Sequence, residues 1–124
     1  MRVMDSNILI YHLNDQLPPR VDQQLATWSE EGSLISVITR IEVLGYQQPV
    51  SEYRKAQLLL SLFREVPLRE PLVTMTIQFR QRYRLRIPDA VIAATAAHLD
   101  VPLVTRNVKD FGSVEEVGII NPFE

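Results

Sequence analysis

The stretch that decides the fold is PDAVIAATAAHLDVPLVT, residues 88–105. Its first part, 88–99, is rich in alanine, the strongest helix former, and we expect a helix there. Its last four residues, 102–105, read as a strand. A helix that leads through a short connection into a strand is the repeating unit of α/β proteins. This segment therefore predicts an α/β fold.

The same alternation continues toward both ends of the chain. Further strands are expected at 2–5, 33–39, 65–68 and 117–120. Further helices are expected at 6–13, from Thr39 to a break at Gly45, and at 21–31, 51–65 and 71–83. Strands that alternate with helices predict a parallel sheet with helices on both faces. Because no repeat or linker interrupts the pattern, we expect one domain over residues 1–124.

The composition of the chain excludes several classes of protein and of binding site. The chain has no cysteine, which excludes disulfides and thiolate metal sites and agrees with a reducing, cytoplasmic compartment. No apolar run approaches the roughly 18 residues that span a membrane, and the N-terminus does not read as a signal peptide. The formal net charge of −2 argues against a protein that coats nucleic acid by bulk charge.

Four acidic residues stand where expected strands end or helices begin. Asp5 ends the first strand, Glu42 lies in the first turn after the second strand, Asp89 opens the alanine-rich helix, and Asp110 follows the strand 102–105. Functional groups of parallel α/β sheets gather at the carboxyl ends of the strands. We therefore expect these acids to converge on one edge of the sheet.

Converging carboxylates need a cation or a shared proton. Two unit charges 4 Å apart repel by about 4 kcal/mol at an effective dielectric constant near 20. Oxygen ligands without cysteine or paired histidine suit Mg²⁺ or Mn²⁺. Such an ion can activate water against a phosphodiester, so the expected chemistry is hydrolysis of a nucleic-acid backbone.

Each acid also has a purely structural interpretation. Thr39 and Glu42 match a capping box, Asp5 could be an N-cap, and Asp89 could complement a helix dipole. Asp110 could be an ordinary loop acid. The set of four favours a functional site more than any single member does.

Three blocks together resemble the PIN-domain family: DSNILIYHL from Asp5, ISVITRIEVLGY from Ile35, and IPDAVIAATAAHLDVPLVTRNVKDF from Ile87. The likeness is greatest to the VapC-type toxins of bacterial toxin–antitoxin pairs. It implies a three-layer fold with a parallel sheet of about five strands and Mg²⁺- or Mn²⁺-dependent cleavage of RNA. It also implies a homodimer and an antitoxin partner whose tail covers the groove.

The resemblance assigns roles to individual residues. Asp5, Glu42 and Asp89 resemble the first, second and third family acids, as catalytic residues and metal ligands. Asp110 is assigned as the fourth, with Asn107 as a possible neutral substitute. Groups expected to orient the acids or a bound water are Ser6, Asn7, Thr39, Thr105 and Asn107.

A basic cluster lies just before Asp89. It consists of Arg80, Arg82, Arg84 and Arg86, four of the 11 arginines. A basic lip beside an acidic pocket would hold RNA phosphates, and solvated surface or partner salt bridges are the equal alternative. Arg40 and Arg106 could contact phosphate too.

Two other functions compete with the nuclease interpretation of the sequence. One is a PIN-like module, catalytically weak or inactive, that binds RNA or protein. The other, a phosphatase of α/β type, would need a glycine-rich phosphate loop, which the chain lacks. It would also need a positioned lysine, and the chain has only Lys55 and Lys109.

The helix 51–65 carries more leucine than one buried side requires, so part of that surface is expected to face a partner. Trp28 and Phe63 are expected in the core or on a partner-facing surface.

Overall fold

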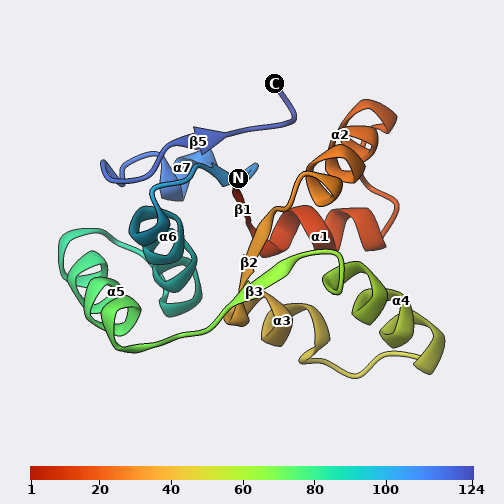
Figure 1. The fold of residues 1–124 in the computed structure, drawn as a ribbon, viewed down its shortest axis with the longest axis horizontal. Coiled ribbons are helices and arrows are strands. Elements are labelled where there is room, and N and C mark those ends of the chain that lie inside the picture. Colours follow the sequence, from red (N-terminus) through yellow and green to blue (C-terminus); the bar gives the residue numbers. More distant parts are fainter.

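A five-stranded parallel sheet forms the centre of the computed structural model, which describes residues 1–124 (Figure 1). The strand order is β3-β2-β1-β4-β5, with Val3 of β1 paired to Leu34 of β2 and to Leu103 of β4. The strands are β1 Val3–Met4, β2 Leu34–Ser36, β3 Arg64–Val66, β4 Leu103–Val104 and β5 Ile119–Ile120. The predicted parallel sheet of about five strands is confirmed.

Seven helices connect and cover the strands. They are α1 Ser6–Leu13, α2 Pro19–Glu30, α3 Val37–Leu44, α4 Val50–Leu60, α5 Glu70–Arg82, α6 Ile87–Leu99 and α7 Val108–Phe111. Figure 1 shows α5 and α6 on one side of the sheet and α1 to α4 on the other. The expected arrangement of helices on both faces is therefore confirmed. None of the helices has the length and apolar character that crossing a membrane requires.

Alternate residues of each strand enter two separate cores, because successive side chains of a strand point to opposite faces. Val3, Leu34 and Leu103 pack with α5 and α6. Their neighbours Met4, Ile35 and Val104 pack with α1, α2 and α4. Every residue from 89 to 96 is buried, so α6 lies at the centre of the molecule. Its alanines allow this close approach to the sheet and to α5.

The second strand is shorter than the sequence predicted. The apolar run 33–39 predicts one strand, but β2 ends at Ser36 and α3 begins at Val37. The Ser36 hydroxyl accepts a hydrogen bond from the backbone N–H of Ile38 and so caps α3. This cap outweighs the strand propensity of Val37, Ile38 and Thr39.

The predicted helix 51–65 ends early, at Leu60, and β3 begins at Arg64. Trp28 and Phe63 are buried in the core between α1, α2 and α4, so the core interpretation of these two side chains is correct. Leu58 and Leu62, in contrast, are 69% and 56% exposed. Part of this leucine-rich segment therefore lies on the surface, and its contact with a partner stays a prediction.

The strand order places a switch point at the centre of the sheet. The chain runs from β1 outward to β2 and β3, and then returns to the other side of β1 to form β4 and β5. Ligands of open α/β sheets bind beyond the carboxyl ends of the strands at such a point. Asp5 and Thr105 directly follow β1 and β4 at this place.

Candidate active site

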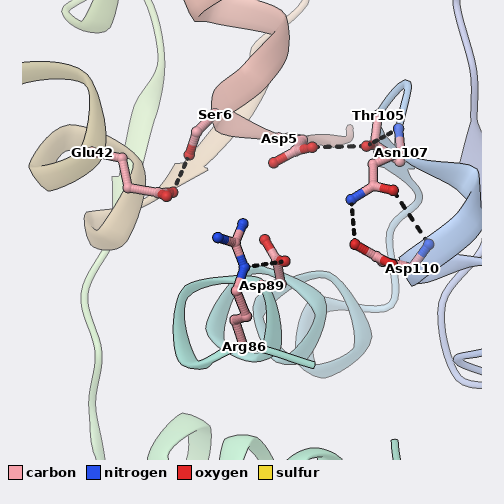
Figure 2. Close-up of polar contacts among 8 residues, drawn as sticks. All are labelled: Asp5, Ser6, Glu42, Arg86, Asp89, Thr105, Asn107 and Asp110. Atoms are coloured by element: carbon pink, nitrogen blue, oxygen red, sulfur yellow. Dashed lines mark hydrogen bonds and ion pairs between the residues drawn. The ribbon is translucent and has the colours of Figure 1, made fainter. Parts of the chain in front are cut away.

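The four predicted acids face one opening beyond the carboxyl ends of β1 and β4 (Figure 2). Asp5 follows β1, Glu42 comes from α3, Asp89 from the first turn of α6, and Asp110 from α7. They come from four different elements and span most of the chain. This placement agrees with the prediction that the acids converge on one edge of the sheet.

Asp5 is the most enclosed of the four, with 3% of its surface exposed. It is the N-cap residue of α1, as the structural interpretation expected, but its side chain makes no capping hydrogen bond. One of its oxygens accepts a hydrogen bond of 2.7 Å from the hydroxyl of Thr105, which is fully buried. Two adjacent strands therefore hold Asp5 in place.

The negative charge of Asp5 is unfavourable where it lies. Its pKa is raised from the ordinary value of 3.8 to about 6, chiefly because burial removes the carboxylate from water. The Thr105 hydrogen bond lowers the pKa, while the negative charges of Asp89 and Glu42 raise it. The protein thus holds a carboxylate whose ionised form a nearby cation would stabilise.

Glu42 lies in the second turn of α3, not in its first turn, because α3 begins at Val37 and has no acid in its first turn. The capping-box interpretation with Thr39 is therefore wrong. Glu42 instead accepts a 2.7 Å hydrogen bond from the Ser6 hydroxyl. The Ser6 oxygen also lies 2.9 Å from the Thr39 hydroxyl oxygen. Since Ser6 has a single proton, Thr39 donates to Ser6 and Ser6 donates to Glu42.

Asp89 is mostly buried, and its pKa is raised, first by burial and then by the negative charge of Asp110. Arg86 opposes this shift: its guanidinium Nε lies 3.6 Å from an Asp89 oxygen. The position of Asp89 in the first turn of α6 also suits the helix dipole. The dipole interpretation and the site interpretation are therefore compatible for this residue.

Asp110 is exposed and is held by Asn107. The Asn107 amide donates to an Asp110 oxygen at 2.9 Å, and the Asn107 carbonyl accepts from the Asp110 backbone N–H. The Asn107 side chain caps α7 in this way. Asn107 therefore positions Asp110 in this structure, and Asp110 belongs to a short helix instead of a free loop.

Several other residues predicted to serve the site do not contact the four acids. Asn7 is exposed and makes no side-chain hydrogen bond to any of the acids. Arg40 pairs with Glu65, and Arg82 pairs with Glu116, so neither guanidinium points freely into the opening. The guanidinium carbon of Arg106 lies 4.3 Å from the centre of the Phe123 ring.

Within the arginine cluster, only Arg86 contacts one of the four acids. The spacing R-x-x-D, three residues apart at a helix start, was the signal that could have revealed this pair in the sequence. Arg80 and Arg84 are exposed and have no ion-pair partner. Lys55, required by the phosphatase alternative, pairs with Glu52 on α4.

The donor chemistry of the opening fits a hard divalent cation, although no group of three or more acidic or histidine side chains is arranged to hold a metal ion as it stands. All candidate ligands are carboxylate oxygens, and Asp5 carries a buried charge that a cation would neutralise. Mg²⁺ is commonly held by one or two carboxylates, with waters and substrate phosphates completing its shell. Asp5 and Asp89 supply carboxylates of the kind that this mode of binding uses.

Comparison with known proteins identifies the family. The model of the family described as "PIN domain" matches residues 2–117. The chain belongs to the PIN-domain family. A curated relative of this PIN-domain chain, the ribonuclease VapC10 of Mycobacterium tuberculosis, is 32% identical over 123 residues, which cover 94% of this chain and 90% of the relative.

Solved structures show the same PIN-domain arrangement. A toxin–antitoxin complex from Klebsiella pneumoniae contains a chain 29% identical, with a TM-score of 0.81, over 100% of this chain and 99% of that one. FitAcB from Neisseria gonorrhoeae is 26% identical, with a TM-score of 0.83, over 100% and 99% of the two chains. Both likenesses extend over the whole domain, so the elements that carry the four acids lie within the matched fold.

Proposed function

We propose that this PIN-domain protein is a divalent-metal-dependent endoribonuclease, the toxin of a toxin–antitoxin pair, in a single nuclease domain over residues 1–124. The observation that carries the proposal is the enclosed Asp5 carboxylate, with Asp89 and Glu42 close enough to raise its pKa. The similarity to a VapC ribonuclease over 94% of the chain supports RNA as the substrate. VapC ribonucleases of the PIN family generally depend on a divalent metal.

In this proposal Asp5 and Asp89 would hold Mg²⁺ or Mn²⁺, and Glu42 and Asp110 would supply the remaining protein ligands. A bound divalent ion supplies a more acidic water and neutralises charge that develops on the scissile phosphate. Thr105 keeps one Asp5 oxygen engaged, so the other oxygen is available to the opening. Asn107 gives the same restraint to Asp110.

Glu42 is placed to act on the attacking water. The Ser6 hydroxyl fixes one carboxylate oxygen and leaves the second free to accept a proton. As the water oxygen bonds to phosphorus, Glu42 takes the water proton. The bond from phosphorus to the leaving ribose oxygen breaks, and that oxygen is protonated from solvent. This sequence of events is hydrolysis of one phosphodiester bond.

The proposed partners follow from the solved relatives. One structure with this fold is described as a toxin–antitoxin complex, and another, VapBC2 from Rickettsia felis, is bound to a DNA fragment from its promoter. We propose an antitoxin protein as the partner of this chain, a homodimer as its assembly and the cytoplasm as its location. The exposed Leu58 and Leu62 supply apolar surface for one of these contacts.

An RNA cleavage assay tests the proposal. Purified protein is incubated with total RNA and Mn²⁺ or Mg²⁺, and parallel reactions contain EDTA. Asp5→Asn and Asp89→Asn should each abolish cleavage, while the exposed Asp100→Asn should retain it. Cleavage that persists in EDTA, or in both site variants, would refute the proposal.

The second candidate is a PIN-like module that binds RNA or protein without cutting it. The amide side chain of Asn107, at a position where an acid could serve as a further ligand, favours this candidate. It predicts binding of RNA, measured by gel shift, at protein concentrations and metal conditions where no cleavage product forms.

A further inference from the structure

Arg86 is the one basic side chain that contacts any of the four acids, namely Asp89, and nothing else in the fold accounts for its position. It is the N-cap residue of α6 but makes no side-chain cap hydrogen bond. Its side chain is 82% exposed, and its only ion-pair partner is Asp89. The neighbouring Leu85 is buried and anchors the chain here. The guanidinium therefore has no structural role beyond its contact with Asp89.

The guanidinium faces the same opening as the carboxylates of Asp5 and Glu42 (Figure 2). It supplies a positive charge beside Asp89, whose negative charge together with that of Glu42 acts on Asp5. A divalent ion held by Asp89 would need the carboxylate that Arg86 contacts, and the two cations would repel each other. Arg86 and the divalent ion therefore compete for Asp89.

The Arg86–Asp89 contact is weak enough to be exchanged. It is long, at 3.6 Å, and it involves an exposed side chain. Exposed ion pairs of this kind contribute little to stability because water and salt screen them. Once released, the guanidinium lies at the mouth of the opening, where an RNA phosphate must enter. Guanidinium groups bind phosphate oxygens with two parallel hydrogen bonds.

We propose that Arg86 is an exchangeable counter-ion: it pairs with Asp89 until a divalent cation takes that carboxylate, and it then binds a phosphate of the RNA substrate. This inference rests on the proposed nuclease function. It assigns Arg86 two effects of opposite sign, since the side chain weakens metal binding and strengthens RNA binding. A residue that only stabilises the fold, or only adds positive charge, would not produce this combination.

The test compares Arg86→Ala with Arg84→Ala, which removes the same charge from an exposed residue that has no ion-pair partner. Mn²⁺ binding is measured by calorimetry, and RNA cleavage is measured at saturating Mn²⁺. Arg86→Ala should tighten the Kd for Mn²⁺ by about 2- to 5-fold and raise the KM for RNA by about 5-fold, with little change in kcat. Arg84→Ala should leave the Kd for Mn²⁺ nearly unchanged.

Distinct results separate this inference from the proposed function. If wild-type protein binds Mn²⁺ and Arg86→Ala binds it equally well or more weakly, the counter-ion role is wrong and the nuclease proposal stands. Equal tightening in Arg84→Ala would overturn the inference as well, because it would show a general charge effect. An unchanged KM would overturn the phosphate contact. If wild-type protein neither binds Mn²⁺ nor cleaves RNA, the proposed function itself fails.

Discussion

Replacing Asp5 by asparagine should stabilise the metal-free protein at neutral pH. Asparagine keeps an oxygen that accepts the Thr105 hydrogen bond and removes the buried charge. The pKa of Asp5 lies at about 6 in the folded protein, against an ordinary value of 3.8. Because one pKa unit corresponds to about 1.4 kcal/mol, ionised Asp5 destabilises the fold by about 3 kcal/mol.

The sign of the pH dependence follows from the raised pKa. The folded state holds the Asp5 proton more tightly than the unfolded chain does, so this group favours folding most at low pH. Its contribution is lost as the pH rises from 3.8 through about 6. Asp5→Asn should therefore be about 3 kcal/mol more stable than wild type at pH 7.5 and within about 1 kcal/mol of it at pH 4.

Chemical denaturation in EDTA at the two pH values measures this difference. Asp100→Asn is the matched control, since Asp100 is exposed, with a φ of 54° that asparagine tolerates. Added Mn²⁺ should stabilise wild type but not Asp5→Asn, because ligands stabilise only the state that binds them. If Asp5→Asn were no more stable than wild type at pH 7.5, Asp5 would not carry an unfavourable buried charge, and the reasoning would be refuted.

Two further substitutions test the groups around the acids. Ser6→Ala removes the hydroxyl that holds Glu42, so we expect kcat for RNA cleavage to fall about 10-fold. Ser6→Thr keeps the hydroxyl and should retain most of the activity. Equal loss in both variants would indicate a packing effect instead. Phe111→Ala empties a fully buried position in α7 and should cost about 3–5 kcal/mol of unfolding free energy, measured by denaturant titration. A loss below about 1 kcal/mol would show that α7, and with it Asp110, is not anchored through Phe111.

The fold class could be predicted because local and global signals agree. The alanine-rich segment 88–99 forms α6 almost to the residue, and the strand 102–105 contains β4. Element boundaries were less predictable where two preferences compete. The second half of the run 33–39 is β-branched and favours a strand. A helix nevertheless begins there, because the Ser36 hydroxyl accepts a hydrogen bond from the Ile38 backbone N–H and caps it.

The candidate site residues could be chosen from the sequence, but their hydrogen-bond partners could not. Position at strand ends and helix starts was enough to select Asp5 and Asp89. The hydrogen bonds from Thr105 to Asp5 and from Ser6 to Glu42 join residues 100 and 36 positions apart, and only the folded sheet brings them together. The pairing of Arg40 with Glu65 likewise depends on the register of β2 and β3.

The central claim is that a divalent cation binds among Asp5, Asp89 and Glu42, and paramagnetic broadening by Mn²⁺ tests it most directly. In a ¹H–¹⁵N spectrum recorded with substoichiometric Mn²⁺, the backbone amide signals of Ser6, Asp89 and Thr105 should broaden first, and Asp5→Asn should abolish this selectivity. Another acidic pair with a histidine lies elsewhere: His12 contacts Asp22, and His12 also lines a pocket with Glu52. Broadening that began at this second group, or that spread evenly over the surface, would contradict the claim.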